Sequence, residues 1–443
     1  MTDFVMLFLL IIGLAIYFVK PKYLFIYWLG IQPYMMPVFF VLFKDGLMPM
    51  DENFLPKLYF YFPNTLSGLL LLLSFVSYIK DNREAKLFKI ILLPFLLLLS
   101  FIVIQNFLNG FYLRSLYWNT IFLFWHIAPF VLLAIDKNVR PDRKSFVHFV
   151  TIFVYVQFLF CILNLYGFRI YGEFSGIFDD NLICGTFTRY NHMANFLGIF
   201  FFILSYEYYE NRSIHLISYY STAFLIGLII MLSGSRMTLV LFVFTALYLF
   251  YVYNSKKVII VSFLTIISLF GMYIIGNDSF LGQQADDGTG LERNLIGIID
   301  LANSDDLSQG STLALSVYLL IDKFNSPMLG NGKSARPINY YGHYTDTINE
   351  TVYKTDARLA FMFVEYGVVG LSLFFFLFAS MFKSCYLYSE EHCKYFYWGA
   401  SIYFLLFSLT DNGFWDYIIF STLFIYVFSI KYKRVSSYVP ASK

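Results

Sequence analysis

Residues 216–253 decide the fold class, and they read LISYYSTAFLIGLIIMLSGSRMTLVLFVFTALYLFYVY. Two uncharged apolar runs, 216–232 and 237–253, are separated by the short polar sequence SGSR at 233–236. Each run is close to the roughly 20 residues that an α-helix needs to cross the hydrocarbon core of a bilayer. Neither run alternates apolar and polar residues as a strand of a membrane barrel does. The stretch therefore predicts two transmembrane helices joined by a tight polar turn.

The rest of the chain repeats this pattern. Of its 443 residues, 59% are hydrophobic and only 14% are charged, against about 45–50% and about 25% in a soluble globular protein. Apolar runs lie near 4–19, 23–43, 65–79, 90–108, 115–135, 145–167, 194–209, 216–232, 237–253, 258–275, 358–383, 395–410 and 417–430. We expect an all-α polytopic integral membrane protein with about 12–13 transmembrane helices. A disordered or fibrous protein is excluded, and a soluble enzyme is disfavoured.

The basic residues predict which side each loop faces. If the runs alternate across the bilayer, nineteen of the 31 Lys and Arg fall in one set of short loops with the C-terminal tail. The short loops of the other side hold six. Because Lys and Arg concentrate in cytoplasmic loops, we expect a cytoplasmic C-terminus and an external N-terminus.

This topology divides the chain into three parts. Residues 1–275 hold transmembrane helices and the external loop 168–193, and residues 276–357 form one large external loop. Residues 358–443 hold the last helices and a cytoplasmic tail. A loop as long as 276–357 is usually functional or disordered, and a predicted short helix near 312–324 favours a folded, functional loop.

The end of the long loop is polar and rich in tyrosine. It includes Arg336, Tyr340, Tyr341 and His343. Tyrosine combines an apolar face with a hydroxyl, which suits stacking on sugar rings with hydrogen bonding. The same side chain also anchors proteins at the membrane interface, and the sequence leaves both interpretations open.

Arg236 is the most unusual charge, because it sits between two apolar runs. A charge next to hydrocarbon is expensive, so it is usually functional or else extends to the interface. The planar guanidinium suits bidentate binding of phosphate oxygens, and Ser233 and Ser235 offer hydroxyls beside it. We expect an anion site at this turn.

A second polar group precedes the run at 194–209. Arg189, Asn191 and His192 place a cation, an amide and an imidazole at the outer interface. The group either binds an anion or a sugar, or caps a helix through Asn191.

A third polar group lies where the long loop re-enters the membrane. Asp356 either caps the following helix or acts as a general base, and Arg358 beside it would keep the carboxylate ionised. Glu365 follows Arg358 by seven residues, so helical spacing puts both on about the same face. An acid at that depth in a membrane is also a functional candidate.

Several motifs are missing from the sequence. It has no phosphate-binding Gly-rich loop followed by Lys and Ser or Thr, no His-Glu-x-x-His, and no external Asp-x-Asp. Its four cysteines lack metal-ligand spacing. No repeat with paired broken helices indicates a secondary transporter, and no basic domain indicates nucleic acid. We therefore expect no metal and no cofactor.

Four short motifs, in this order, resemble those of the bacterial O-antigen polymerase and O-antigen ligase superfamily (Wzy-type polymerases and their ligase relatives). They are Gly185-Thr186-Phe187 with Asn191-His192-Met193-Ala194, Ser233-Gly234-Ser235-Arg236, Pro327 with Gly330-Asn331-Gly332, and Glu365-Tyr366-Gly367-Val368-Val369-Gly370. The resemblance spans about residues 180–430, and the order of the motifs is more specific than any one of them.

The resemblance implies a metal-independent, inverting glycosyltransferase of the GT-C type in the bacterial inner membrane, with its active site facing the periplasm. Its substrates would be oligosaccharide repeat units on undecaprenyl diphosphate, and a chain-length regulator protein would be a partner. Arg236, Arg189 and Arg358, with Ser233 and Ser235, would bind the diphosphate. Asp356 would be the base, with His343 and Glu365 as alternatives. The sugar-binding residues would be Asn191, His192, Arg336, Tyr340 and Tyr341.

Two departures from the family pattern bear on the activity. The ligase relatives carry a His-Asn pair where this chain has Asp356-Ala357, which favours a polymerase. The family's loop arginine is missing from 311–320, and Arg293, Arg336 or Arg358 would have to substitute. The alternatives are an O-antigen ligase that transfers polymer to the lipid A core, and a flippase for lipid-linked oligosaccharides.

Overall fold

The structure, a computed structural model, describes part of the chain. The described residues are 2–31, 72, 85–108, 116, 127–166, 168, 183–187, 190–210, 213–233, 235–253, 327–330, 338–339, 343–344, 358–388, 396, 398–403 and 417–429. The predicted run 258–275, nearly all of 65–79 and most of the long loop lie outside the described residues.

Helices dominate the described parts. The elements are α1 (Thr2–Val19), η1 (Pro21–Tyr23), α4 (Ala85–Leu108), η4 (Lys137–Val139), α6 (Arg143–Leu165), α7 (Tyr190–Tyr209), α8 (Leu216–Leu232), α9 (Arg236–Tyr253), β1 (Ile338–Asn339), β2 (His343–Tyr344), α13 (Arg358–Tyr388) and α15 (Tyr417–Ser429). The strands pair antiparallel, with Ile338 opposite Tyr344. Apart from this two-residue pair, the described elements are helical, as an all-α protein requires.

Three helical stretches among the described residues are long and apolar enough to cross a membrane. They are Ile90–Leu108, Arg143–Leu165 and Tyr366–Ser384, and they fall on the predicted runs 90–108, 145–167 and 358–383. The predicted membrane protein is supported in this coarse form. The total of about 12–13 spans, the GT-C-like architecture and the three-part division of the chain stay predictions.

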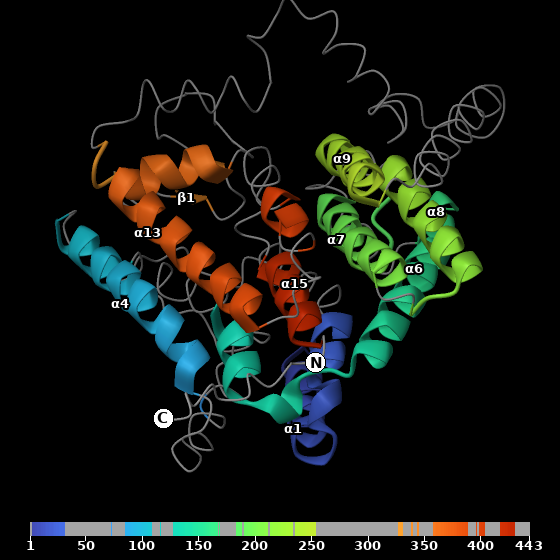
Figure 1. Ribbon diagram of the computed structural model, residues 1–443, viewed down its shortest axis with the longest axis horizontal. Helices are drawn as coiled ribbons and strands as arrows, with labels where there is room; N and C mark the ends of the chain where they lie inside the picture. The colour runs from blue at the N-terminus through green and yellow to red at the C-terminus, as the bar shows by residue number, and fades with distance from the viewer. Residues whose placement is uncertain are drawn as a thin grey trace, which may run out of the picture.

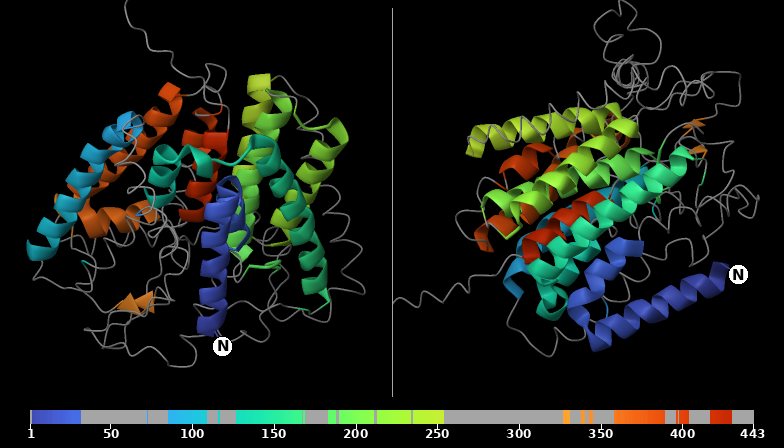
Figure 2. Two further views of the ribbon diagram at one scale, coloured as in Figure 1. Left: turned by 90° about the horizontal axis from the view of Figure 1, so that it is seen from below. Right: turned by 90° about the vertical axis from the view of Figure 1, so that its right-hand side faces the viewer.

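Two groups of helices make up the described molecule. α7 packs against α6, α8, α9 and α15, whereas α13 packs chiefly along α4. Figure 1 shows these groups on either side of α15. Both views in Figure 2 place the N-terminus, the two strands and the C-terminal end of α6 at the same end of the molecule. We call this end the loop end.

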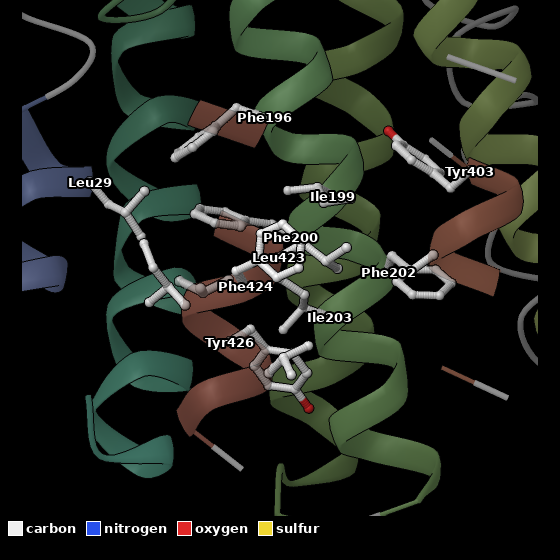
Figure 3. Packing of buried hydrophobic residues seen from close by; sticks show 14 of the residues in the cluster. Leu29, Phe196, Ile199, Phe200, Phe202, Ile203, Tyr403, Leu423, Phe424 and Tyr426 are labelled. Atoms are coloured by element: carbon white, nitrogen blue, oxygen red, sulfur yellow. The ribbon is translucent and has the colours of Figure 1, made fainter. Parts of the chain in front are cut away.

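Aromatic packing fills the centre, where α7 meets α15 (Figure 3). All six residues of 196–202 other than Gly198 have buried apolar side chains, so this stretch of α7 is apolar all round. A helix of that kind belongs inside a bundle rather than on its surface. Ring pairs connect the helices, with centroids 4.9 Å apart for Phe130 and Phe424, and 4.7 Å for Tyr206 and Phe396. Figure 3 shows Phe424 and Tyr426 facing the α7 side chains.

A buried ion pair ties three elements together far from the loop end. Glu207 near the end of α7 is fully buried, and its two carboxylate oxygens accept hydrogen bonds from Nε and Nη2 of Arg143, at the start of α6, each at 2.6 Å. The hydroxyls of Tyr426 on α15 and of Ser213 also donate to this carboxylate, each at 2.5 Å. The buried charge is therefore paired and hydrogen-bonded, which is what makes such burial tolerable.

Arg140 connects the segment before α6 to its neighbours. Its Nε donates to the carbonyl of Leu133 at 2.8 Å, and its Nη2 donates to the carbonyl of Ala134 at 3.2 Å. These carbonyls lie in the last turn of the helix at 127–135, where they have no amide partner within the helix. The guanidinium also lies 5.1 Å from the ring centroid of Phe428. Arg140 and Arg143, which are among the nineteen basic residues predicted to face the cytoplasm, therefore also hold helices together.

Candidate functional site

A chain of buried polar side chains joins the start of α7 to the turn between α8 and α9. Ser233 Oγ donates to the carbonyl of Ile230 at 2.7 Å and accepts from the amide of Ser235 at 3.3 Å. The hydroxyls of Ser235 and Thr238 lie 2.8 Å apart, and Thr238 donates to the side-chain oxygen of Asn195 on α7. All are at least nine-tenths buried. The turn that precedes Arg236 is thus fixed against α7.

This contact brings candidate residues together at the backbone level. α9 begins at Arg236, two residues before Thr238, and Asn191 and His192 lie in the first turn of α7, before Asn195. The starts of α7 and α9 are therefore neighbours. The side chains of Arg236, Asn191 and His192 lie outside the described parts, so the structure does not test their roles.

The hydroxyls of Ser233 and Ser235 are described, and both make hydrogen bonds within the protein. They hold the turn in shape. Their predicted role as diphosphate ligands stays a prediction.

Two amide side chains on α6 hold the segment that leads to α7. Oε1 of Gln157 accepts a hydrogen bond from the backbone amide of Thr186 at 3.0 Å, and its Nε2 donates to the Thr186 hydroxyl at 2.6 Å. Oδ1 of Asn164 accepts a hydrogen bond from the backbone amide of Gly185 at 2.8 Å. Gly185 has φ of 59°, and a Cβ there would lie 2.5 Å from the Gln157 side chain. The Gly-Thr-Phe motif is therefore a tight turn locked onto α6, just before Arg189, which lies outside the described residues.

A second locked turn lies at the other end of the long loop, on α13. Gly367 breaks this helix with φ of 66° and ψ of −172°, and Figure 1 shows the two arms of α13 at an angle. At the break, the amides of Val368 and Val369 donate to the carbonyls of Pro327 and Met328, at 2.9 and 3.1 Å. The turn 327–330 and residues 367–369 form what we call the clasp.

Gly367→Ala is expected to open the clasp. The backbone conformation of Gly367 is essentially limited to glycine and costs other residues of order 1–3 kcal/mol. A Cβ would also lie 2.5 Å from the Met328 carbonyl oxygen. We expect a lower thermal-unfolding midpoint of the purified protein and a loss of activity. Gly30→Ala is the control, because its Cβ would meet Phe149 at an ordinary 3.7 Å. Wild-type stability and activity of Gly367→Ala would contradict this account.

The first arm of α13 carries two of the predicted residues. Arg358 begins the helix, and Glu365 lies two residues before the break, so the predicted helical spacing between them is confirmed. Their side chains are not among those described. Asp356 precedes the start of this arm by two residues and lies outside the described residues. In the long loop, His343 lies in β2, while Arg336, Tyr340 and Tyr341 fall outside the described residues.

Sequence reasoning missed the residues that hold these turns. They are Gln105, Gln157, Asn164, Asn195 and Thr238, all buried and all in apolar helices. A side-chain amide inside a membrane-spanning run could have revealed the Gln and Asn residues, because burying such a group costs free energy unless it has a hydrogen-bond partner. Within the described part of the chain, no three His, Cys, Asp or Glu side chains gather where they could hold a metal ion.

Two comparisons relate the chain to known proteins. No curated protein matches the chain. A family model described as O-Antigen ligase matches residues 221–375, a range that contains the α8–α9 turn, the long loop and the clasp. Residues 221–375 therefore form a domain of the O-antigen polymerase and O-antigen ligase superfamily.

Proposed function

We propose that this protein is an O-antigen polymerase. It would act on repeat units carried by undecaprenyl diphosphate, at the periplasmic face of the inner membrane, with its C-terminus in the cytoplasm. The family match over residues 221–375 supports polymerase or ligase activity. The observation that favours the polymerase is Asp356-Ala357, at the position where ligase relatives carry a His-Asn pair.

The proposed transfer needs a cation and a base. The acceptor hydroxyl oxygen of a new repeat unit attacks the anomeric carbon of the growing chain, and the bond from that carbon to the diphosphate breaks with inversion. The leaving lipid diphosphate takes the electron pair, so fixed cations stabilise it where its charge grows. Arg236 is assigned this role, with Arg189 and Arg358 next. The hydroxyl proton passes to Asp356, or else to His343 or Glu365.

The backbone geometry supports a shared site for the diphosphate. The Asn195–Thr238 hydrogen bond makes the start of α7 a neighbour of the start of α9. Arg189 directly precedes α7 and Arg236 begins α9. Two cations from separate loops can therefore approach one anion. In this proposal, Asn191, His192, Arg336, Tyr340 and Tyr341 contact sugar.

The second candidate is an O-antigen ligase, and the description of the matching family model favours it. A ligase would use the same lipid-diphosphate leaving group, but its acceptor would be a sugar of the lipid A core. The same cations would serve both reactions. The two activities differ in the acceptor and therefore in the product that accumulates when the protein is lost.

Lipopolysaccharide banding in a strain that lacks the protein tests the proposal. Loss of a polymerase leaves core with a single repeat unit, and the wild-type chain restores the ladder. Asp356→Asn, which keeps the shape but cannot take the proton, is expected to leave core plus one unit. Asp136→Asn is the control, since this carboxylate precedes η4 and accepts from Asn138.

Two results would overturn the polymerase assignment. Polymer that is built on the lipid carrier but not attached to core would indicate the ligase. Repeat units that accumulate on the cytoplasmic leaflet would indicate a flippase. A full ladder from Asp356→Asn would remove this residue from the mechanism.

A further inference from the structure

Gln105 is a polar side chain inside the transmembrane stretch of α4, and it is 3% exposed. Burying an amide in an apolar setting costs free energy unless it is hydrogen-bonded. The Nε2 group of Gln105 donates to the backbone carbonyl of Leu329. Gln105 therefore reaches from α4 to a turn that lies more than 200 residues later in the chain.

The Gln105 hydrogen bond completes a regular pattern in the clasp. Three successive carbonyls of the turn each accept one hydrogen bond: Pro327 from Val368, Met328 from Val369, and Leu329 from Gln105. The break at Gly367 is what leaves the amides of Val368 and Val369 free of partners within their own helix. α4 and the break in α13 thus meet at one turn.

Hydrogen bonds to its backbone, more than full apolar burial, hold this turn in place. Met328 is 61% exposed and Leu329 is 38% exposed, so neither side chain is fully buried. The backbone approach between Gly330 and Gly367 is so close that a Cβ at Gly367 would clash with it. Removing one of the three hydrogen bonds therefore removes a large part of what fixes the turn.

We infer that Gln105 is a positioning residue for the proposed glycosyl transfer, and the inference rests on that proposed function. The chain leaves the clasp at Gly330 and returns to it at Gly367. All of the loop candidates for base, cation and sugar contact lie between these points: Arg336, Tyr340, Tyr341, His343, Asp356, Arg358 and Glu365. Gln105 fixes the point from which this segment starts and to which it returns, relative to the spans.

The first test measures the position of the segment without using activity. Gln105→Met keeps the length of the side chain but removes the donor. In the purified full-length protein, we expect trypsin to cut after Lys333 about threefold to tenfold faster than in wild type, as expected for one lost hydrogen bond. Ser384→Ala is the control, because Ser384 is buried on α13 but bonds only within its own helix, to the carbonyl of Ser380.

The second test measures turnover, with lipid-linked repeat units extracted from a strain that lacks the protein. We expect kcat of Gln105→Met to fall about tenfold or more, since small misplacements of reacting groups are costly, while KM changes less than about threefold. Gln105→Met combined with Gly367→Ala is expected to lose no more activity than the worse single variant, because both open the same clasp.

The outcomes separate the inference from the proposed function. Unchanged cleavage of Gln105→Met would overturn the clasp, whatever the protein does. Faster cleavage with unchanged kcat would overturn the positioning role. A wild-type protein that does not extend the repeat units would overturn the proposed function and, with it, the link between Gln105 and catalysis. The cleavage comparison would still test whether Gln105 holds the clasp.

Discussion

Arg236→Ala is expected to abolish the polymer ladder and leave core with single repeat units. A fixed charge-stabilising group of this kind contributes on the order of 10²–10³ in rate, and no ladder survives such a loss when every bond in the polymer needs the same step. Arg236→Lys keeps the charge but loses the bidentate fork, so we expect short, faint ladders. Gel banding of lipopolysaccharide from complemented strains measures both.

The control for Arg236→Ala removes a cation elsewhere. Lys22 lies in η1, where its ammonium is 5.0 Å from the ring centroid of Tyr23. Lys22→Ala is expected to give a wild-type ladder. A full ladder from Arg236→Ala, at wild-type protein abundance, would show that the proposed diphosphate site is wrong.

Glu207→Leu is expected to lower the free energy of unfolding by about 3–5 kcal/mol, the usual cost of removing one partner of a buried ion pair. The change leaves the guanidinium of Arg143 without its two 2.6 Å acceptors and removes the acceptor of Tyr426. Thermal or denaturant unfolding of the purified protein in detergent measures the effect.

Two further variants define the cause of that loss. Asp142→Ala removes an exposed carboxylate that caps α6 by accepting from the amide of Ser145, and it is expected to cost only about 1 kcal/mol. Arg143→Leu combined with Glu207→Leu is expected to regain much of the loss, because apolar replacement of both partners is often neutral. If Glu207→Leu unfolds like wild type, the ion pair does not stabilise the bundle.

The helices themselves could be predicted from the sequence. The runs 216–232 and 237–253 became α8 (Leu216–Leu232) and α9 (Arg236–Tyr253), with one residue of difference at one end. Continuous apolar runs leave the backbone no partner but itself in a bilayer, so length and composition suffice. The polar turn between them could be predicted in the same way.

The break in α13 could not be predicted. The run 358–383 reads as one span, and a glycine within it looks like the small residue that membrane helices often contain. Gly367 becomes a break because a turn at 327–330 supplies acceptors for the amides that follow it. That partner is forty residues away in sequence, and periodicity carries no information about it.

The candidate site was predictable in kind but not in arrangement. Arg236 could be predicted because a charge beside hydrocarbon is conspicuous. Asn195 and Thr238, whose hydrogen bond fixes the turn before Arg236, could not, because they look like ordinary members of apolar runs. Ser233 and Ser235 were expected to face a ligand, and the structure shows their hydroxyls bonded within the protein. In the sequence, a serine that binds a ligand cannot be distinguished from one that forms hydrogen bonds within the protein.

The clasp also has a consequence for how the long loop can vary. The entropy lost on bringing two chain ends together depends on the length between them. Because Gly330 and Gly367 already meet, the closure cost of segment 331–366 is set by its own length and by no residue before 327. A change of length upstream leaves segment 331–366 and its candidate residues as they are, whereas a change downstream alters the spacing of those residues from the clasp. Homologous chains that differ in size would be expected to gain or lose residues between 276 and 326.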